Sequence, residues 1–405
     1  MHLRDRLQAM RGWFKTLDLE QLLFLAIGTT LAILVRISLL SFKSADYDTF
    51  TKVWYNTLQS LGYQAFKGDF SNYSPPYLYL LYFVVRFLPG MDKVAAIKIP
   101  SIVADFACAA FVYKIVQLRA GNKLVPLLAY MAVLLTPVAV LNSSFWGQAD
   151  SIYTAALMGC VYFLMTRRNW PAFIAFGLAF AFKLQAVFLA PLLVILWLKR
   201  EVSWKHFLAI PAVYFLGILP AWVIGRPLPS LLTIYASQTD YYNRLAMHAP
   251  SLYAWFPNNP DFTPLLYPAG LAFGASLILI FILLGAKSKV KLAPRLLIEL
   301  AAFSTLLAPF VLPKMHQRYF FPADVLSIVF GFFFPAYFYV PLAINVVSYF
   351  SYQYFLFGPE DVPLSVLALA TLLILGIFTR KLVLDLYPVG PEPVGGPDEP
   401  VVESD

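Results

Sequence analysis

The amino-acid sequence predicts an all-α, polytopic transmembrane helical bundle with about twelve membrane spans. Of the 405 residues, 60% are hydrophobic and only 13% are charged, whereas soluble domains carry about 25% charged residues. The apolar runs approach the ~20 residues that one helix needs to cross a bilayer. They lack the two-residue alternation of a membrane barrel, and backbone groups in lipid must be paired within their own segment. Each run is therefore expected to be a helix.

The expected spans follow one another along most of the chain, with one long loop between the first span and the second. They cover residues 21–42, 97–117, 124–142, 148–166, 170–184, 186–198, 205–224, 264–285, 292–312, 319–334, 336–357 and 363–386. The first loop is 43–96, and the whole transmembrane domain is expected over 21–387. A polar segment, 1–20, precedes this domain. The tail, 388–405, is rich in proline, glycine and acidic residues, a composition typical of disorder.

Lysine and arginine are concentrated in alternate turns between the expected spans. The basic clusters lie at residues 4–15, 114–123, 167–168, 199–205, 287–295 and 380–381. Basic residues in short loops favour the cytoplasm, so we expect these turns and both termini on the cytoplasmic side of a plasma membrane. These turns also explain the formal net charge of +8. The expected partners therefore include membrane lipids and no nucleic acid.

The basic clusters share one side only if residues 75–90 do not cross the membrane. This segment is short for a span and contains Arg86, so we predict a juxtamembrane helix. If it did cross, every later loop would change sides. Cys108 and Cys160 lie inside apolar spans and are expected to pack there, rather than form a disulfide or bind a metal.

The first loop begins with two carboxylates, Asp46 and Asp48, followed at helical spacing by Phe50 and Trp54. A carboxylate at the boundary between membrane and water can act as a general base or bind a metal. Aromatic side chains in such a loop can contact a lipid or a sugar ring. The alternative is that Asp46 only caps an interfacial helix, and the residues alone leave both interpretations open.

Two further polar sites interrupt the apolar pattern on the same expected face. Trp146, Gln148 and Asp150 form a turn before a span, where Asp150 either caps the helix, contacts a substrate, or does both. Lys183 and Gln185 interrupt another apolar stretch. Lys183 either extends its ammonium group to the interface or meets an anion.

The turn at 313–322 contains Lys314, His316, Arg318 and Tyr319. Cations on an outer surface run against the usual charge distribution, and they are explained if they bind a phosphate or pyrophosphate group. With the carboxylates and aromatics, they fit an enzyme whose donor is a sugar linked through phosphate to a membrane lipid. The alternatives are a transporter or lipid-linked sugar flippase, which would place polar residues near the midplane, and a non-catalytic scaffold.

The order of these motifs resembles the GT-C superfamily of membrane glycosyltransferases, which use polyprenyl- or dolichyl-phosphate sugars. The spacing of Asp46, Phe50 and Trp54 is similar to the first loop of bacterial relatives of the GPI-anchor mannosyltransferases. The segments YSPPY at 73–77, FWGQAD at 145–150, FKLQA at 182–186 and KMHQRYFFP at 314–322 continue the resemblance.

The resemblance implies an inverting transfer on the extracytoplasmic face, with a polyprenyl-phosphate-sugar as donor and a lipid, glycan or protein as acceptor. The sugar would be mannose or another hexose. Asp46 would be the general base, with Asp48 as the second candidate. The implied substrate-binding residues are Trp54, Tyr73, Trp146, Gln148, Asp150, Lys183, Gln185, Lys314, His316, Arg318 and Tyr319.

The resemblance does not decide whether a metal takes part. Some members of the superfamily use a divalent metal such as Mg or Mn, and others use none. Many relatives carry an acidic residue where this chain has Gln317, so no metal ligand is assigned and the metal is left open.

Overall fold

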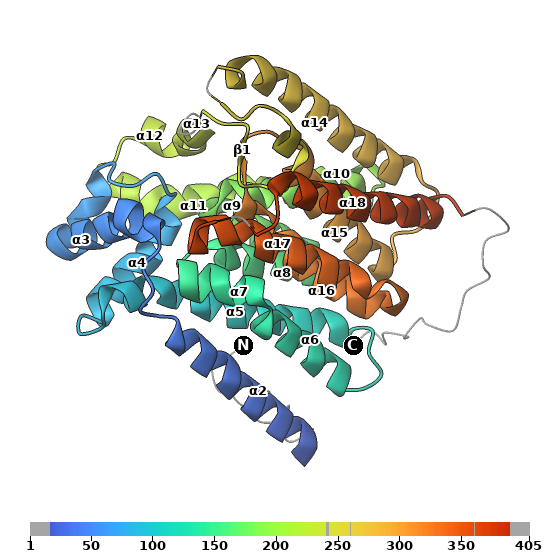
Figure 1. Cartoon of the computed structure of the whole chain (residues 1–405), viewed down its shortest axis with the longest axis horizontal. Coiled ribbons are helices and arrows are strands. Elements are labelled where there is room, and N and C mark those ends of the chain that lie inside the picture. The colour runs from blue at the N-terminus through green and yellow to red at the C-terminus, as the bar shows by residue number, and fades with distance from the viewer. Residues whose placement is uncertain (1–16, 240–242, 260, 360, 389–405) are drawn as a thin grey trace.

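The computed structural model describes residues 17–239, 243–259, 261–359 and 361–388. The expected tail from residue 389 and most of the expected N-terminal segment lie outside this part of the chain. The described residues form a bundle of helices with the first-loop helices gathered at one end, the left of Figure 1. The predicted all-α bundle is confirmed.

Each of the twelve expected spans corresponds to a helical segment. The helices before the long second loop are α2 (Leu19–Ser38), α3 (Lys52–Leu61), α4 (Pro75–Phe87), α5 (Lys93–Gln117), α6 (Leu124–Leu135), α7 (Pro137–Val140), α8 (Asp150–Met165), α9 (Asn169–Phe182), α10 (Ala190–Leu198) and α11 (Ala209–Val223). The later ones are α12 (Leu228–Leu232), α13 (Ile234–Thr239), α14 (Thr263–Lys287), α15 (Pro294–Val311), α16 (Phe321–Phe333), α17 (Tyr339–Phe357) and α18 (Leu364–Leu386).

Short π and 3-10 turns connect many of these helices. They are η1 (Tyr47–Thr51), η2 (Gly62–Lys67), η3 (Leu141–Trp146), η4 (Leu184–Leu189), η5 (Trp204–Leu208), η6 (Leu252–Trp255), η7 (Gln317–Phe320) and η8 (Pro335–Tyr337). By length and composition, 6 helices of the described chain can cross a membrane, or 7 if one bent pair is a single span. The remaining expected spans are shorter helices or are divided by a turn.

The bent pair shows how a break in a helix positions polar residues. The segment from α6 to η3 bends by 46° at Pro137, which lacks an N–H group and cannot continue a regular helix. At its far end Gly147 has a φ of +81°, a conformation that favours glycine. The resulting turn presents Trp146 and Gln148 at the end of the bundle.

The first loop packs on the bundle rather than extending from it. Helix α3 contacts α4, and α4 contacts α5, α9 and α11. The 13 residues of α4 span about 20 Å at 1.5 Å per residue, less than the ~30 Å hydrocarbon core of a bilayer. The length of α4 supports the prediction that residues 75–90 do not cross the membrane, and this stays a prediction.

The predicted cytoplasmic turns meet at one end of the bundle. Arg119 donates a hydrogen bond of 2.8 Å to the carbonyl of Phe332, in the last turn of α16. Arg167 pairs with Glu201 at 2.7 Å, and Lys199 Nζ donates to a carbonyl in the turn after α14. These contacts join turns that the charge pattern placed on one side of the membrane.

At the opposite end, the loop between α11 and α14 docks on the turn between α15 and α16. Strand β1 (Ala246–Met247) pairs in parallel with strand β2 (Met315–His316). The backbone N–H of Lys314 also donates to the carbonyl of Leu245 at 2.7 Å. Two-residue strands have no recognisable sequence pattern, and the sequence did not predict this pairing.

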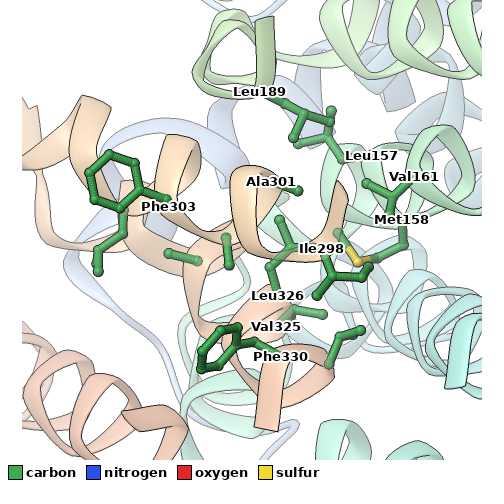
Figure 2. Close-up of a cluster of buried hydrophobic side chains, with 14 of the residues drawn as sticks. Leu157, Met158, Val161, Leu189, Ile298, Ala301, Phe303, Val325, Leu326 and Phe330 are labelled. Atoms are coloured by element: carbon green, nitrogen blue, oxygen red, sulfur yellow. The ribbon is translucent and has the colours of Figure 1, made fainter. Parts of the chain in front are cut away.

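Helices α8, α15 and α16 form the centre of the bundle (Figure 2). In α15, 83% of the apolar 18-residue stretch is buried inside the protein, whereas in α14 the buried share is 22%. Lipid offers the same apolar surroundings as a leucine side chain, so close packing rather than the hydrophobic effect holds such helices together. The labelled core residues are Leu157, Met158, Val161, Leu189, Ile298, Ala301, Phe303, Val325, Leu326 and Phe330. The rigid α15–α16 pair fixes the turn between them.

An ion pair that the sequence analysis did not single out lies inside the bundle. Arg36 of α2 donates two hydrogen bonds, of 3.0 and 2.9 Å, to one oxygen of Asp105 of α5. Its third nitrogen donates to the carbonyls of Ala32 and Leu134. Ser143 donates to the same Asp105 oxygen at 2.6 Å. Both charged side chains are 1% exposed.

The start of the first loop is held by a lysine. Lys98 of α5 donates hydrogen bonds of 3.0, 3.0 and 2.9 Å to the carbonyls of Leu39, Leu40 and Phe42. These carbonyls follow the end of α2, where the helix no longer supplies N–H partners. The lysine therefore fixes the chain a few residues before Asp46.

Candidate active site

A cavity of about 280 Å³ opens at the end of the bundle that carries the first loop. This volume is close to the lower end of the range of about 300–1,000 Å³ for small-molecule sites. The residues expected from the sequence that line it are Asp46, Trp54, Tyr73, Gln148, Lys183, Gln185, Lys314, His316, Arg318 and Tyr319. The structure thus brings together side chains from segments far apart in the sequence.

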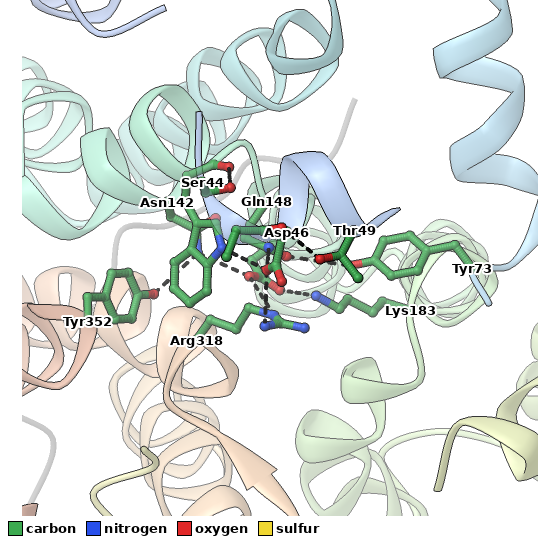
Figure 3. A network of polar contacts seen from close by, with 12 residues as sticks. Ser44, Asp46, Thr49, Tyr73, Asn142, Gln148, Lys183, Arg318 and Tyr352 are labelled. Carbon is green, nitrogen blue, oxygen red and sulfur yellow. Dashed lines mark hydrogen bonds and ion pairs between the residues drawn. The ribbon is translucent and has the colours of Figure 1, made fainter. Parts of the chain in front are cut away.

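Asp46 lies on the cavity wall with one oxygen anchored. Its Oδ2 accepts a 2.8 Å hydrogen bond from the indole of Trp146 and a 2.6 Å bond from the carboxamide of Gln148. The other oxygen, Oδ1, accepts no hydrogen bond from the described residues, and the side chain is 19% exposed. The side chain makes no capping bond to η1, so the capping interpretation of Asp46 is wrong. Figure 3 shows Asp46 facing Gln148 and Arg318.

The two donors to Asp46 are themselves held in place. The Trp146 ring stacks on Phe355 at a centroid distance of 4.6 Å and meets Tyr352 edge-on at 5.3 Å. Gln148 Oε1 lies 3.5 Å from the phenol of Tyr73, which donates to it. Burial raises the pKa of Tyr73 above its ordinary value, so this phenol remains a donor at neutral pH.

Asp150 lies directly behind the cavity wall and is fully buried. It accepts a 3.0 Å hydrogen bond from Asn142 and pairs with Lys183. Helix α8 begins at Asp150 itself, and no side chain caps it. The capping interpretation of Asp150 is therefore wrong, because its carboxylate points away from its own helix end toward a lysine.

Lys183 stands at the break between α9 and η4. It is 7% exposed and pairs with Asp150, so the interpretation that it extends to the interface is wrong. Its ammonium group lies 5.7 Å from the ring centroids of Tyr73, Tyr153 and Tyr319. Carboxylate and aromatic faces together stabilise a buried cation.

Arg318 faces both carboxylates without bonding to either. Its Nη1 lies 4.0 Å from Asp46 Oδ2 and its Nε 4.0 Å from Asp150 Oδ2, beyond the 2.7–3.2 Å of a hydrogen bond. The buried Nε has no hydrogen-bond partner. The guanidinium carbon lies 5.5 Å from the Trp146 ring and 5.6 Å from the Tyr319 ring. The site therefore holds an arginine with an unused donor at Nε, an arrangement suited to an anion.

His316, in the same turn as Arg318, does not carry the positive charge that the sequence indicated. Burial, followed by the positive charges of Arg318, Lys183 and His248, lowers the pKa of His316 well below its ordinary value. The imidazole is therefore neutral at neutral pH, and the cations of this turn are Lys314 and Arg318. Lys314 has a φ of +61°, and its ammonium group lies 4.5 Å from the Tyr267 ring centroid.

Asp48, the second carboxylate of the first loop, does not line the cavity. Its side chain is 62% exposed and pairs with Lys52 at 3.2 Å, one helical turn along η1 and α3. Trp54, by contrast, is buried against Tyr73 at a centroid distance of 5.0 Å and lines the cavity. The helical spacing of the first loop thus turns Asp46 and Trp54 inward and Asp48 outward.

Several lining residues were missed by sequence reasoning. Asn72, Gln238, Met247 and Tyr267 reach the cavity from the first loop, the second loop and the start of α14. Met247 is placed by the β1–β2 pairing. A polar carboxamide in a loop has no distinguishing pattern, so the sequence held no signal for Asn72 or Gln238.

The ligand set at the site does not fit a divalent metal. In the described part of the chain, no group of three or more His, Cys, Asp or Glu side chains could hold a metal ion. The two carboxylates, Asp46 and Asp150, already face Lys183 and Arg318, which neutralise them. The residues present fit an anion instead.

No family model and no curated protein matches the chain. Solved structures match it in fold: ArnT from Cupriavidus metallidurans bound to undecaprenyl phosphate has a TM-score of 0.54 at 12% sequence identity, covering 88% of this chain and 76% of that one. The apo form of ArnT has a TM-score of 0.51 at 13% identity, covering 93% and 77%. The chain therefore has the GT-C fold, as the resemblance implied.

Proposed function

We propose that this protein is an integral membrane glycosyltransferase that transfers a hexose, with mannose as the first candidate, from a polyprenyl-phosphate-linked donor. The observation that carries the proposal is the pair formed by Asp46 and Arg318 in one cavity. Asp46 offers a carboxylate oxygen without a hydrogen bond, and Arg318 offers a donor without an acceptor. A transfer that takes a proton from an acceptor and releases a phosphate needs both.

In the proposed step, the acceptor hydroxyl gives its proton to Oδ1 of Asp46. The acceptor oxygen forms a bond to the anomeric carbon of the sugar while the bond from that carbon to the phosphate oxygen breaks. The polyprenyl phosphate leaves with the electron pair of that bond. Trp146 and Gln148 hold Oδ2 throughout, and fixed geometry of this kind lowers the entropic part of the barrier.

The carboxylate arrangement supports inversion at the anomeric carbon. Retention through a covalent intermediate would need a second carboxylate as nucleophile. Asp150 is fully buried, pairs with Lys183 and does not line the cavity. A single displacement, with Asp46 as the base, is the reaction that these residues support.

The cations supply a place for the leaving phosphate, whose negative charge grows as its bond to the sugar breaks. Arg318 and Lys314 line the cavity together with Lys183. An arginine in a partly buried site can form short, charge-assisted hydrogen bonds to phosphate oxygens. The ArnT structure of the same fold is bound to undecaprenyl phosphate, which supports a polyprenyl phosphate as the lipid carrier here.

The position of the cavity supports an extracytoplasmic site in a plasma membrane, with both termini in the cytoplasm. The cavity and the basic turns that include Arg119, Arg167 and Lys199 lie at opposite ends of the helices. Lysine and arginine favour the cytoplasmic side. The cavity would then open on the opposite side, to a lipid, glycan or protein acceptor.

The test is the transfer of radiolabelled sugar from polyprenyl-phosphate-mannose and polyprenyl-phosphate-glucose in membranes. We expect Asp46→Asn to lower kcat about 10²–10⁴-fold, because the amide keeps the hydrogen bonds to Oδ2 but cannot accept the proton. Asp48→Asn is the matched control, and we expect it to stay within about threefold, since exposed ion pairs contribute little. Folded wild type that transfers no sugar but moves the lipid-linked sugar across the bilayer would favour a flippase.

A further inference from the structure

The cavity wall carries four carboxamide side chains that come from four separate segments. They are Asn72, Gln148, Gln185 and Gln238. Gln148 is bonded to Asp46 and Tyr73, and Gln238 donates to the backbone carbonyl of Asn72 at 2.5 Å. The carboxamides of Gln185 and Asn72 have no such role.

Gln185 is 8% exposed, and its buried Oε1 has no hydrogen-bond partner. The Oδ1 of Asn72 is also buried without a partner. Neither carboxamide forms a side-chain hydrogen bond with the described residues. Buried polar groups are nearly always paired, and both of these residues line the cavity, where a ligand can supply the missing partners.

An ionised phosphate cannot supply the partners that these two buried oxygens lack. A carboxamide oxygen accepts hydrogen bonds, and so do the oxygens of an ionised phosphodiester. A sugar hydroxyl can donate to the carboxamide oxygen and accept from its NH₂ group. Gln185 and Asn72 therefore match the sugar, whereas Arg318 matches the phosphate.

The charges of the wall add a further selection. Asp46 is the only acidic residue among the described residues that line the cavity, whereas Lys183, Lys314 and Arg318 are cations. A sugar ammonium group would be repelled by these cations. We propose, on the basis of the proposed function, that Gln185 and Asn72 form a donor-sugar subsite that selects neutral hexoses over amino sugars.

The experiment compares polyprenyl-phosphate donors that carry mannose, glucose or an amino sugar, using the full-length protein in membranes. We expect wild type to use a neutral hexose donor. Gln185→Leu should lower its kcat/KM about 10-fold or more, because the sugar hydroxyl is then buried without its partner. Asn72→Leu, which lies in the first loop, should act in the same direction and guards against a folding defect in the first variant.

Polyprenyl phosphate without a sugar is the second measurement. As a competitive inhibitor it should bind Gln185→Leu and wild type within about twofold of each other, because it lacks the hydroxyls that Gln185 would contact. Gln59→Leu, an exposed glutamine of α3 that does not line the cavity, is the matched control and should change neither value.

The outcomes separate this inference from the function on which it rests. Wild type that transfers a hexose, together with a fully active Gln185→Leu, would overturn the subsite and leave the glycosyltransferase standing. Wild type that uses only an amino sugar would do the same. Wild type that transfers no sugar from any donor would remove both proposals. A Gln185→Leu variant that weakens inhibition by the sugar-free lipid as strongly as it slows transfer would show a general defect and overturn the subsite.

Discussion

The protein contains two buried arginine–aspartate networks that differ in how the arginine is bonded. In the interior, Arg36 donates two bonds to Asp105 and others to backbone carbonyls. At the cavity, Arg318 stands 4.0 Å from both Asp46 and Asp150, and its Nε has no partner.

The comparison separates a structural charge from one that is available to a ligand. Ionisable residues inside membrane spans are functional candidates by default. Arg36 meets that criterion, yet all of its nitrogens are used within the protein and it does not line the cavity. An unused Nε donor and a position on the cavity wall, rather than burial, distinguish Arg318.

The largest expected effect comes from breaking the interior pair. Arg36→Met leaves the Asp105 carboxylate buried without its cation, which should lower the free energy of unfolding by about 3–5 kcal/mol. Thermal unfolding of the purified protein in detergent measures this effect. Activity per folded molecule should stay near that of wild type, because Arg36 does not touch the cavity.

The double variant Arg36→Met with Asp105→Leu is the control for this prediction. Replacing both members of a buried pair by apolar residues is often neutral, so most of the lost stability should return. If the double variant is no more stable than Arg36→Met, the pair does not act as the structure indicates.

The second prediction concerns the cavity arginine. Arg318→Met should lower kcat/KM about 10²–10³-fold, the range for removing one preorganised donor to a developing negative charge. The melting temperature should move much less than in Arg36→Met, because Arg318 makes no hydrogen bond to the two carboxylates. A variant that loses stability but keeps its activity would reverse the roles assigned to the two arginines.

The smallest effect is a pH dependence of stability from His316. Burial, and then Arg318, Lys183 and His248, lower the pKa of this imidazole in the folded protein. Between the lowered pKa and the ordinary value of ~6.5, the unfolded chain therefore binds the proton more readily than the folded one. Stability should be unaffected above about pH 6.5 and should fall below it, by up to about 1.4 kcal/mol per pH unit.

Melting temperatures of wild type and His316→Gln between pH 7.5 and pH 5 measure this contribution. The variant lacks the titrating ring, so its melting temperature should fall less with acid than that of wild type. Equal slopes for the two proteins would mean that His316 is not held neutral in the folded state.

The sequence predicted the helices and the charged residues of the cavity wall because both depend on local pattern. Apolar runs mark α5 or α14 directly, and a charge such as Arg318 at the end of a span stands out against its neighbours. The spacing from Asp46 to Trp54 also predicted that both belong to one helical face, as the structure confirms.

The remaining features depend on contacts between distant segments. Nothing near Asp150 in the sequence shows that its partner is Lys183, so the capping interpretation was equally available. The β1–β2 pairing that places Met247 involves too few residues for a periodic signal. Asn72 and Gln185 acquire their significance only from the absence of partners, which a sequence cannot show.

The sequence separation within the two networks has a consequence for how the protein enters the membrane. Asp150 and Lys183 are 33 residues apart on consecutive helices, so they can insert as one hairpin whose charges neutralise each other. Arg36 and Asp105 are 69 residues apart. At 5–20 residues per second, the ribosome takes roughly 3–14 s to make that interval. The first helix is therefore made several seconds before α5, and during that interval Arg36 lacks the carboxylate with which it pairs in the folded protein.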